Sequence, residues 1–355
     1  MLKLAFMQNI SDSLVNNPTP LLSICIPTYN RGRYLENCLK SIHKALSEVG
    51  HEVEICISDN SSADNTVDVI EKLRGLLPIR YHRNALNVGM ARNILKVVSM
   101  ARGEFVWLVG DDDLVMPNGI SKLLGLLTRH EEVDFFYVNA NHLDSSFLEN
   151  WPHPFNTDHL PMSMERFSKA CIPRSLDFFE LVSPAISFDF LGGIFLSVFR
   201  REKWIGSVHV LDTTALESSA TFSHLDNTFP HLKVWAAAFS KSKAYFNPDP
   251  LVVCITGIRE WAPMTPIIMS VRLPEALWAY RSNGMSWWRY FFCMNYALRN
   301  FAADFANIVL HRKLYKFNVS YMQIILASLP YPNTYFSPFY FAARRIRSIF
   351  VGRKC

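Results

Sequence analysis

The fold is decided by residues 21–60, which read LLSICIPTYNRGRYLENCLKSIHKALSEVGHEVEICISDN. The apolar run at 21–30 predicts a buried strand that ends in polar residues. Between positions 35 and 46 the apolar residues recur at intervals of three and four, which is helical spacing. A second apolar run at 53–60 predicts another strand. A strand, a helix and a strand in succession indicate a βαβ unit, whose two strands run parallel.

The same alternation continues to residue 140. Further strands are predicted at 79–84, 104–110 and 133–140, with helical segments between them. This pattern indicates an α/β fold with a Rossmann-like, mostly parallel sheet flanked by helices. Ligands of such sheets bind outside the carboxyl ends of the strands. The acidic segments SDN (58–60) and GDDD (110–113) follow predicted strands and are therefore the first candidates for a binding site.

The rest of the chain is less regular. Residues 141–187 are rich in turns and predict loops with short helices, and 188–204 predict one or two strands with a Gly-Gly turn. Residues 224–239 predict a loop that leads into a helix, and 244–256 predict a last strand. From Pro274 onward the sequence is helical and aromatic.

The amino-acid composition indicates a globular protein with an uneven distribution of charge. Half of the 355 residues are hydrophobic and 19% are charged, which is a globular composition. The formal net charge is +5, but the stretch 275–355 holds eleven Lys and Arg against two acids. The chain therefore has a mildly acidic body and a basic, aromatic C-terminal region.

Cysteine usage and hydropathy bear on the environment. The seven cysteines are scattered and form no CxxC pair, which argues against a disulfide framework or a zinc site and favours a reducing cytoplasm. The N-terminus has no small-residue cleavage pattern, so no signal peptide is expected. The longest uncharged stretch, 318–343, contains Pro330, Pro332 and Pro338, and no transmembrane span is predicted.

Asp111, Asp112 and Asp113 form a run of like charges directly after an apolar strand. Two carboxylates repel by about 1 kcal/mol at ~4 Å in water, and by more where water is scarce. A helix N-cap explains one or two of them. A hard cation such as Mg²⁺ or Mn²⁺, which takes one or two carboxylates together with phosphate oxygens and removes their mutual repulsion, is a better reason for the run of three. The chain has no GxGxxG after its first strand and no GxxxxGK[ST], which argues against a dinucleotide fold or a P-loop.

Four blocks then carry a resemblance to a known family: SICIPTYNRGRYLENCLKSI, EICISDNSSADNT, RNALNVGMARN and GEFVWLVGDDD. In this order and spacing they resemble family-2 glycosyltransferases of the GT-A fold over about residues 21–135. GDDD in place of the more usual Asp-x-Asp-Asp, with the later LGGIFLSVFRREKW and NTFPH, is similar to bacterial abequosyltransferase-like enzymes of O-antigen assembly. The predicted division of the chain is an N-terminal extension (1–20), a GT-A domain (21–260, with a nucleotide-binding half 21–140 and an acceptor half 141–260) and a helical C-terminal region (261–355).

The resemblance implies a site for a nucleotide-sugar. The implied donor contacts are Pro27, Thr28, Tyr29, Asn30 and Arg31 in the first loop, Asp59 and Asn60 at the base or ribose, Asn87, Gly89, Arg92 and Asn93 over the nucleoside, and Asp111 and Asp112. Asp113 and Asp111 are the implied ligands of Mn²⁺ or Mg²⁺. Gly110 stands where many relatives have the first Asp, so which of the three carboxylates ligates stays open.

The reaction also requires a base that takes a proton from the acceptor hydroxyl. Relatives carry this base in a Glu-Asp pair, which the chain lacks. Asp226 in HLDNTFPH lies closest in context, and His231 is an alternative base or metal ligand. Asp189 is a third candidate. Each has a plain structural alternative, since a helical His or a strand Asp can simply satisfy neighbouring groups. The stereochemical outcome stays open.

The basic aromatic region has two interpretations, namely contact with an anionic membrane surface and packing against the body with Arg facing solvent. The residues concerned are Arg289, Arg299, Arg312, Lys313, Lys316, Arg344, Arg345 and Arg347 among Trp287, Trp288, Phe291, Phe292, Tyr315 and Phe350. No recognisable nucleic-acid module is present, so nucleic-acid binding is not expected.

The expected activity is therefore transfer of a sugar, of the dideoxyhexose type, from a nucleotide diphosphate-sugar to a hydroxyl of a lipid-linked, O-antigen-like glycan. The protein is expected in the cytoplasm, peripheral on the inner face of the membrane. Two other classes stay open: a non-catalytic sugar-nucleotide or glycan-binding protein of the same fold, and a nucleotidyltransferase. A nucleotidyltransferase usually has a Gly-rich nucleotide loop early in the chain, which is not seen here.

Overall fold

The protein is described in a computed structural model that covers residues 19–47, 52–149, 160–161, 163–257, 261–315 and 317–351, without the side chains of 148, 149, 190 and 344–351. Most of the predicted N-terminal extension and the junction at 258–260 lie outside these residues. Lys316 and the side chains of Arg344, Arg345, Arg347 and Phe350 lie outside them as well.

Within the described residues, nine strands form one sheet in the order β3-β2-β1-β4-β8-β6-β9-β5, with β7 paired to β9. The strands are β1 (Leu22–Thr28), β2 (Val53–Asp59), β3 (Ile79–Arg83), β4 (Phe105–Leu108), β5 (Leu114–Val115), β6 (Phe135–Asp144), β7 (Arg174–Asp177), β8 (Ser197–Arg200) and β9 (Lys243–Thr256). β1 to β4 run parallel, and so do β6 and β9. Because β8 is antiparallel to both β4 and β6, the two parallel groups share one direction. The predicted mostly parallel sheet is confirmed.

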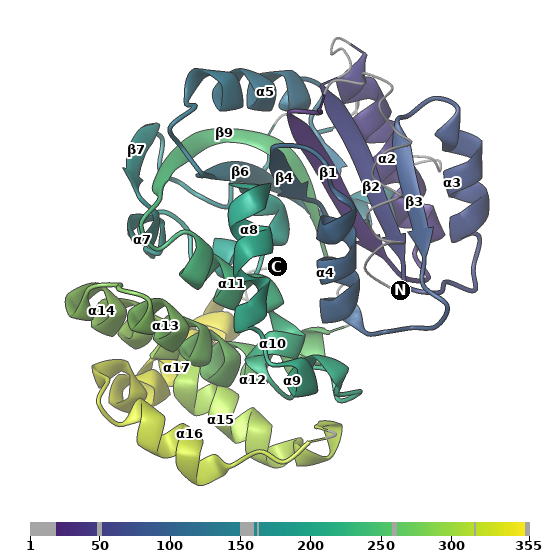
Figure 1. Cartoon of the computed structure of the whole chain (residues 1–355). Helices are drawn as coiled ribbons and strands as arrows, with labels where there is room; N and C mark the ends of the chain where they lie inside the picture. The colour runs from purple at the N-terminus through teal and green to yellow at the C-terminus, as the bar shows by residue number, and fades with distance from the viewer. Residues whose placement is uncertain are drawn as a thin grey trace, which may run out of the picture.

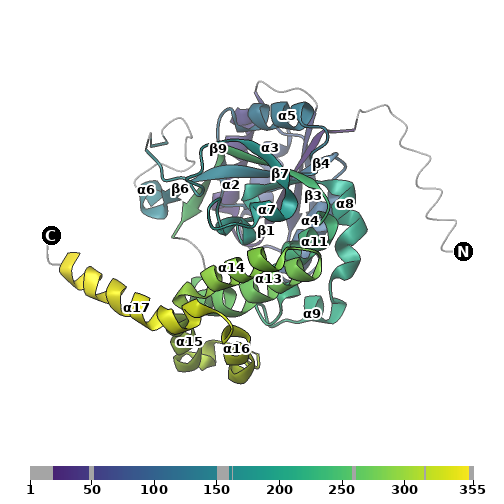
Figure 2. The same ribbon diagram turned by 90° about the vertical axis from the view of Figure 1, so that its left-hand side faces the viewer.

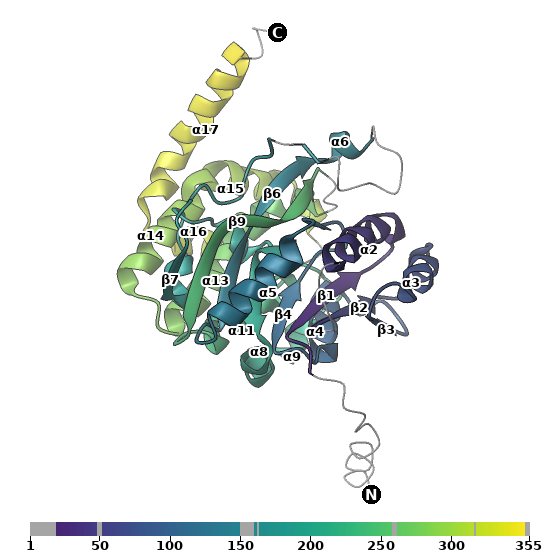
Figure 3. The same cartoon turned by 90° about the horizontal axis from the view of Figure 1, so that it is seen from above.

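Helices cover both faces of the sheet. Figures 1 and 3 show α2, α3 and α5 on one side and α4, α8 and α11 on the other. The helices of the body are α2 (Gly32–Leu46), α3 (Thr66–Arg74), α4 (Met90–Met100), α5 (Gly119–Arg129), α6 (Ser145–Glu149), α7 (Phe178–Leu181), α8 (Arg201–Ser207), α9 (Thr213–Glu217), α10 (Leu225–Thr228) and α11 (Pro230–Ala238). The strands between the two helical layers are buried along almost their whole length, as a two-sided sheet requires.

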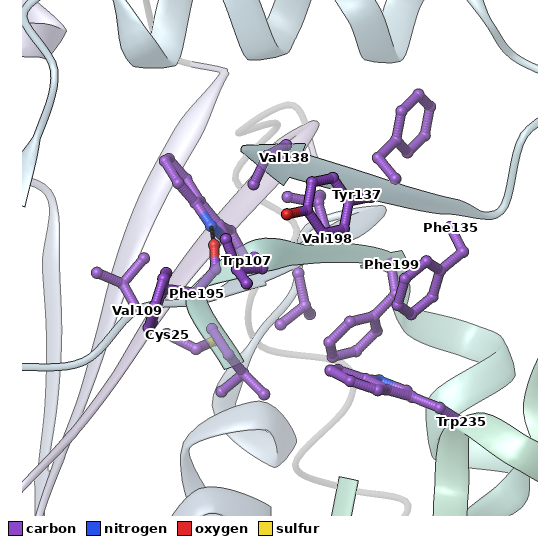
Figure 4. Packing of buried hydrophobic residues seen from close by; sticks show 14 of the residues in the cluster. Cys25, Trp107, Val109, Phe135, Tyr137, Val138, Phe195, Val198, Phe199 and Trp235 are labelled. Atoms are coloured by element: carbon purple, nitrogen blue, oxygen red, sulfur yellow. Dashed lines mark hydrogen bonds between the residues drawn. The ribbon is translucent and has the colours of Figure 1, made fainter. Parts of the chain in front are cut away.

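The core is strongly aromatic. Trp107 of β4 is fully buried and donates its indole N–H to the carbonyl of Phe195 at 2.8 Å. Phe135 of β6 packs edge-on against Trp235, with ring centres 5.2 Å apart. Figure 4 shows these side chains meeting between the sheet and the helix that carries Trp235. Burial of such large rings fixes the strands whose ends carry the site.

The segment 188–204 differs from the expectation of one or two strands with a Gly-Gly turn. Two 3₁₀ helices, η2 (Asp189–Leu191) and η3 (Ile194–Leu196), flank the Gly pair, and only β8 is a strand before α8 begins. Apolar runs of this length do not distinguish a short helix from a strand by periodicity. The strand that does form pairs antiparallel between β4 and β6.

The C-terminal region is helical, as predicted. Its elements are η5 (Ala262–Met264), α12 (Thr265–Ile267), the π-helix η6 (Ile268–Arg272), α13 (Leu273–Ser282), α14 (Trp287–Ala297), α15 (Phe301–Leu310), α16 (Tyr321–Ser328) and α17 (Pro332–Val351). Figure 2 shows these helices below the sheet, with the end of α17 projecting away from the body. Among the described residues, no helix has both the length and the hydropathy that crossing a membrane requires.

Arg272 joins this region to the body. Its Nε donates to the carbonyl of Phe222 at 3.0 Å and its Nη2 to that of Ser223 at 2.7 Å, while Glu275 pairs with Nη1. Phe222 has a left-handed backbone, with φ 69°. The helical region thus holds the irregular segment that leads into α10.

Candidate functional site

The turns at the carboxyl ends of β1 and β2 are bonded to each other. The N–H of Asn30 donates to Ser62 Oγ at 2.8 Å, and the N–H of Ala63 donates to Asn30 Oδ1 at 2.7 Å. The N–H of Gly32, at the start of α2, donates to Asp64 Oδ2 at 2.9 Å. Asn30 has φ 52°, a conformation that Asn tolerates better than most residues. The structure therefore brings the two polar turns together at one edge of the sheet.

Asp59 is the last residue of β2 and is fully buried. Its Oδ1 accepts the N–H of Ser62 at 2.8 Å and its Oδ2 accepts the hydroxyl of Tyr81 at 2.9 Å. Burial and this carboxylate together raise the pKa of Tyr81 well above its ordinary value. Because both oxygens of Asp59 are engaged within the protein, a contact with a base or ribose requires one of these bonds to change.

An asparagine network lies beside Asp59. Asn60 Oδ1 accepts the N–H of Val88 at 2.9 Å and Asn84 Nδ2 at 3.2 Å, and Asn60 Nδ2 donates to Asn87 Oδ1 at 2.7 Å. Asn84 Nδ2 also lies 3.0 Å from Asn93 Oδ1. Asn84 is absent from the sequence prediction, although its position directly after β3 is the same strand-end signal that marked Asp59.

The remaining predicted donor contacts differ in accessibility. Tyr29, Asn30, Asn87 and Arg92 are exposed, whereas Asn93 is buried and Pro27 is half-buried. Gly89 caps the start of α4 with φ 87°, a conformation that favours glycine. The exposed side chains are the ones that can reach a ligand, and the buried ones shape the backbone beneath them.

Asp111 and Asp112 meet the end of β1. Asp111 Oδ2 accepts the hydroxyl of Thr28 at 2.8 Å. Arg31 Nη1 lies 3.3 Å from Asp111 Oδ1 and 2.7 Å from Asp112 Oδ2. Both carboxylates therefore converge on one cationic nitrogen.

The three carboxylates are not equivalent. Asp111 is 6% exposed and Asp113 is 2% exposed, whereas Asp112 is half-buried. Burial, and after it the charge of Asp112, raises the pKa of Asp111 to about 7 and the pKa of Asp113 well above its ordinary value. Asp113 Oδ2 accepts the N–H of Gly110 at 2.9 Å, so this carboxylate turns back onto its own loop.

Gly110 leaves no room for a side chain. A Cβ atom at this position would lie 2.7 Å from Asp113 Oδ2 and 2.9 Å from Asp112 Oδ1. Contacts this short do not occur for real Cβ atoms, so the two carboxylates would have to move. The glycine in place of a leading Asp is therefore part of how this loop packs.

The carboxylates of this loop are the side chains that could hold a hard divalent cation. Among the described residues, no group of three or more His, Cys, Asp and Glu side chains is arranged to hold a metal. The pair Asp111 and Asp112 does converge on a single positive group, Arg31 Nη1. Two carboxylates that leave the other positions to phosphate oxygens and water are the usual protein share of a Mg²⁺ or Mn²⁺ site. The residues present fit such an ion.

Asp226 lies in α10, which packs against α4, α9 and α11. It is buried, and its Oδ2 accepts two hydrogen bonds, from the N–H of Asp212 at 2.7 Å and from Lys233 Nζ at 2.8 Å. Asp212 is itself the N-cap of α9. The Asp226 carboxylate is thus oriented through one of its oxygens by two neighbouring elements, the N-cap of α9 and α11.

His231 and Asp189 occupy very different surroundings. His231 is 1% exposed and packs edge-on against Trp235, with ring centres 4.7 Å apart. Burial lowers the pKa of His231 to about 3, against a weaker opposing contribution from the Leu191 backbone. Asp189 is exposed at the start of η2 rather than in an apolar strand. Asp226 is itself only 4% exposed, so burial does not decide between it and His231 as the base. The difference lies in orientation, since two hydrogen bonds hold the Asp226 carboxylate, whereas the His231 ring packs against Trp235.

Comparison with known protein families gives a match over the N-terminal part of the chain. The family description "Glycosyl transferase family 2" matches residues 23–184. Residues 23–184 therefore form a glycosyl transferase family 2 domain. The matched range includes both strand-end turns, the asparagine network and all three carboxylates.

Two curated relatives are similar to this chain in sequence. The abequosyltransferase RfbV of Salmonella typhimurium is 29% identical over 242 residues, which are 66% of each chain. The hyaluronan synthase of Pasteurella multocida is 31% identical over 160 residues, 44% of this chain but only 16% of the synthase. The aligned part therefore spans less than two thirds of either relative.

A solved structure supports the GT-A fold of this chain. The mannosyltransferase PcManGT of Pyrobaculum calidifontis, solved in complex with GDP-Man and Mn²⁺, matches with a TM-score of 0.52 at 13% identity. The match covers 98% of this chain and 93% of that one. At this identity the likeness concerns the fold.

Proposed function

We propose that the protein is a metal-dependent glycosyltransferase that moves a sugar from a nucleoside diphosphate to an acceptor hydroxyl. One observation carries the proposal: Asp111 and Asp112 converge on a single positive group at the carboxyl edge of the sheet. This edge is where ligands of parallel sheets bind, and the carboxylates belong to a family 2 domain. The exposed side chains Tyr29, Asn87 and Arg92 are the proposed donor contacts around it.

We assign the metal ligands to Asp112 and Asp111. The sequence favoured Asp113 and Asp111, but Asp113 is the most buried of the three and accepts a hydrogen bond from its own loop. Asp112 is the most accessible. Mn²⁺ or Mg²⁺, when bound, neutralises charge that develops on a leaving diphosphate. Asp113 then has the role of holding the turn in shape.

The proposed transfer needs one proton acceptor. Asp226 Oδ2 is occupied by Asp212 and Lys233, so the other oxygen, Oδ1, is assigned to the acceptor hydroxyl. The acceptor oxygen forms a bond to the anomeric carbon, its proton passes to Asp226, and the bond from the anomeric carbon to the diphosphate breaks. General bases of this kind contribute about 10²–10⁴ in rate.

The nature of the sugar and of the acceptor is inferred from relatives. The proposed donor sugar is of the dideoxyhexose type, and the likeness to an abequosyltransferase supports this choice. By the same likeness, the proposed acceptor is a lipid-linked, O-antigen-like glycan intermediate. The proposed location is the inner face of the cytoplasmic membrane.

The C-terminal helices support contact with a membrane surface. Most of the large hydrophobic side chains that are exposed in the described residues lie between Trp278 and Phe341, and Trp288 is 81% exposed. The exposed cations Arg312 and Lys313 lie in the same region. Aromatic rings and cations on one set of helices are typical of binding to anionic headgroups.

A thermal-shift screen with CDP, UDP, GDP and dTDP, each with and without Mn²⁺, tests the proposed donor site. We expect one nucleotide to raise Tm, and its effect to increase with Mn²⁺. Asp112→Asn removes a ligand charge and is expected to abolish the Mn²⁺ increment, while the nucleotide alone still stabilises. If no nucleotide stabilises the wild type, the donor site is wrong.

Activity assays on the wild-type protein distinguish the proposed function from the two alternatives. Donor hydrolysis or transfer that depends on Asp226 supports the glycosyltransferase. Nucleotide binding without any hydrolysis supports a non-catalytic binding protein. Release of pyrophosphate from a nucleoside triphosphate and a sugar phosphate would identify a nucleotidyltransferase.

Vesicle flotation of the full chain tests the membrane contact. With phosphatidylglycerol vesicles we expect the protein to float, and Trp288→Ser with Phe339→Ser to reduce the bound fraction, because both side chains are more than 70% exposed on the C-terminal helices. Ile172→Ser is the matched control, since this residue is 76% exposed on the body. Equal losses in the control and the double variant would contradict a dedicated surface.

A further inference from the structure

Arg31 links the first turn to the carboxylates. It stands at the N-cap of α2, and its side chain is only 19% exposed. Its guanidinium contacts Asp111 and Asp112 through the same nitrogen and lies 5.4 Å from the ring centre of Tyr34. The side chain is thus fixed in the space between the two proposed metal ligands.

We propose that Arg31 is a displaceable counter-ion that makes binding of the divalent cation depend on the nucleoside diphosphate. Arg31 neutralises Asp111 and Asp112 and competes with the cation for them. When the diphosphate is present, Arg31 transfers its hydrogen bonds to phosphate oxygens. This inference rests on the proposed function. It adds a regulatory role for Arg31, which the sequence analysis placed only in a nucleotide-contacting loop.

The competition follows from charge and geometry. Arg31 Nη1 already lies within contact distance of both carboxylates, and a divalent cation between them would repel the guanidinium at short range. A cation that binds without diphosphate therefore breaks the contacts of Arg31 with Asp111 and Asp112. Without diphosphate, the guanidinium gains no new anionic partner in exchange. Phosphate oxygens suit a guanidinium at least as well as carboxylates do, because they accept parallel hydrogen bonds. The cation and the diphosphate should consequently favour each other's binding.

The carboxylates keep other restraints when Arg31 leaves. Asp111 Oδ2 still accepts the hydroxyl of Thr28 at 2.8 Å, and Asp113 still accepts the N–H of Gly110. Among the described contacts, Asp112 alone has Arg31 as its single partner, and Asp112 is the most accessible of the three. The movement required is therefore that of one arginine side chain and one carboxylate.

Mn²⁺ binding, followed by electron paramagnetic resonance of the free ion, tests the proposal without an activity readout. The titration is done with and without the nucleoside diphosphate that raises Tm most. For the wild type we expect the diphosphate to tighten Mn²⁺ binding about tenfold or more. Arg31→Gln should bind Mn²⁺ alone more tightly than the wild type, and the effect of the diphosphate should fall to about threefold or less.

Three further proteins serve as comparisons. Arg31→Met keeps the aliphatic stem near Tyr34 and should reproduce Arg31→Gln if the latter folds poorly. Arg31→Lys keeps the charge and should retain most of the coupling. Arg74→Gln removes an exposed arginine that pairs with Glu71 on α3 and should behave as the wild type.

The outcomes separate this inference from the proposed function. If Arg31→Gln and Arg31→Met bind Mn²⁺ alone no more tightly than the wild type, while Mn²⁺ still binds with the diphosphate, the counter-ion role is wrong and the metal site stands. If the wild type binds Mn²⁺ equally well with and without diphosphate, the proposed dependence of metal binding on the diphosphate is wrong. If the wild type binds no Mn²⁺ in either condition, the proposed metal site itself fails.

Discussion

Lys233 Nζ lies 2.8 Å from Asp226 Oδ2 and forms an ion pair between α11 and α10. The Asp212 N–H donates to the same oxygen at 2.7 Å. Both hydrogen bonds act on Oδ2 and orient the carboxylate, while Oδ1 accepts no hydrogen bond from the described residues. This arrangement allows the catalytic and the structural roles of Asp226 to be separated by substitution.

Asp226→Asn is expected to lower kcat by about 10²–10⁴, because the amide has the same shape but takes no proton. Its Oδ1 can replace the carboxylate oxygen as the acceptor from Asp212 and Lys233, so folding should be retained. The measurement is transfer or donor hydrolysis, with donor Kd and Tm determined for the same protein.

His231→Phe is the comparison for this experiment, since His231 is a buried neighbour in α11 rather than an exposed group. We expect it to keep donor hydrolysis. Loss of hydrolysis in His231→Phe together with retention in Asp226→Asn would reverse the assignment of the base.

Gly110→Ala is expected to weaken Mn²⁺ and diphosphate binding about tenfold or more, a loss of roughly 1.4 kcal/mol. The new methyl would collide with the carboxylate oxygens of Asp112 and Asp113, at 2.9 and 2.7 Å. Isothermal titration with the nucleoside diphosphate and Mn²⁺ measures the effect.

Gly75→Ala is the matched control for this change. A Cβ at Gly75 meets nothing within 4 Å, and the residue has φ −74°, which alanine adopts without strain. We expect unchanged binding and a stability gain of about 0.4–1 kcal/mol. If Gly110→Ala bound Mn²⁺ and diphosphate as tightly as the wild type, the carboxylates of Asp112 and Asp113 could move aside without a loss of affinity.

Much of the fold follows from the sequence because apolar periodicity and parallel topology act together. The runs that end at Thr28, Asp59 and Leu108 are strands of one sheet, so their polar ends had to meet. The segment around Gly192 could not be predicted, because its apolar residues fill the core equally well from 3₁₀ helices or from a strand.

The site is predictable in position but not in detail. The order of Asp111, Asp112 and Asp113 along the chain does not say which one faces inward, since that depends on the turn at Gly110 and its bond to Asp113. The ion pair of Lys233 with Asp226 depends on the angle between two helices. Residue spacing carries no information about either.

Thr28→Val is expected to lower the free energy of unfolding by about 1–3 kcal/mol, because it leaves the buried Asp111 Oδ2 without its hydroxyl donor. The hydrogen bond is 2.8 Å long and both side chains are buried. Urea unfolding at pH 8 measures the change. Thr28→Ser keeps the hydroxyl and is expected to lose clearly less stability, so equal losses in the two variants would assign the effect to packing of the methyl group.

His231 should make the protein less stable in acid. Burial lowers the pKa of His231 to about 3, whereas an unfolded chain has a histidine pKa near 6.5. Between pH 6.5 and pH 3 the histidine is protonated in the unfolded state but stays neutral in the native state. The free energy of unfolding therefore falls as the pH falls below about 6.5. The raised pKa values of Asp111 and Asp113 act in the opposite direction, because there the native state binds the proton more readily.

His231→Phe isolates this effect, because the aspartates are common to both proteins. Between pH 7 and pH 5, the decrease in the free energy of unfolding should be about 2 kcal/mol smaller for His231→Phe than for the wild type. The phenyl ring also suits the edge-on packing against Trp235. Urea unfolding at pH 5, 6 and 7 gives the difference, and His311→Gln, which alters an exposed histidine, is the control. Parallel pH profiles for His231→Phe and the wild type would mean that His231 gains a proton without leaving the core.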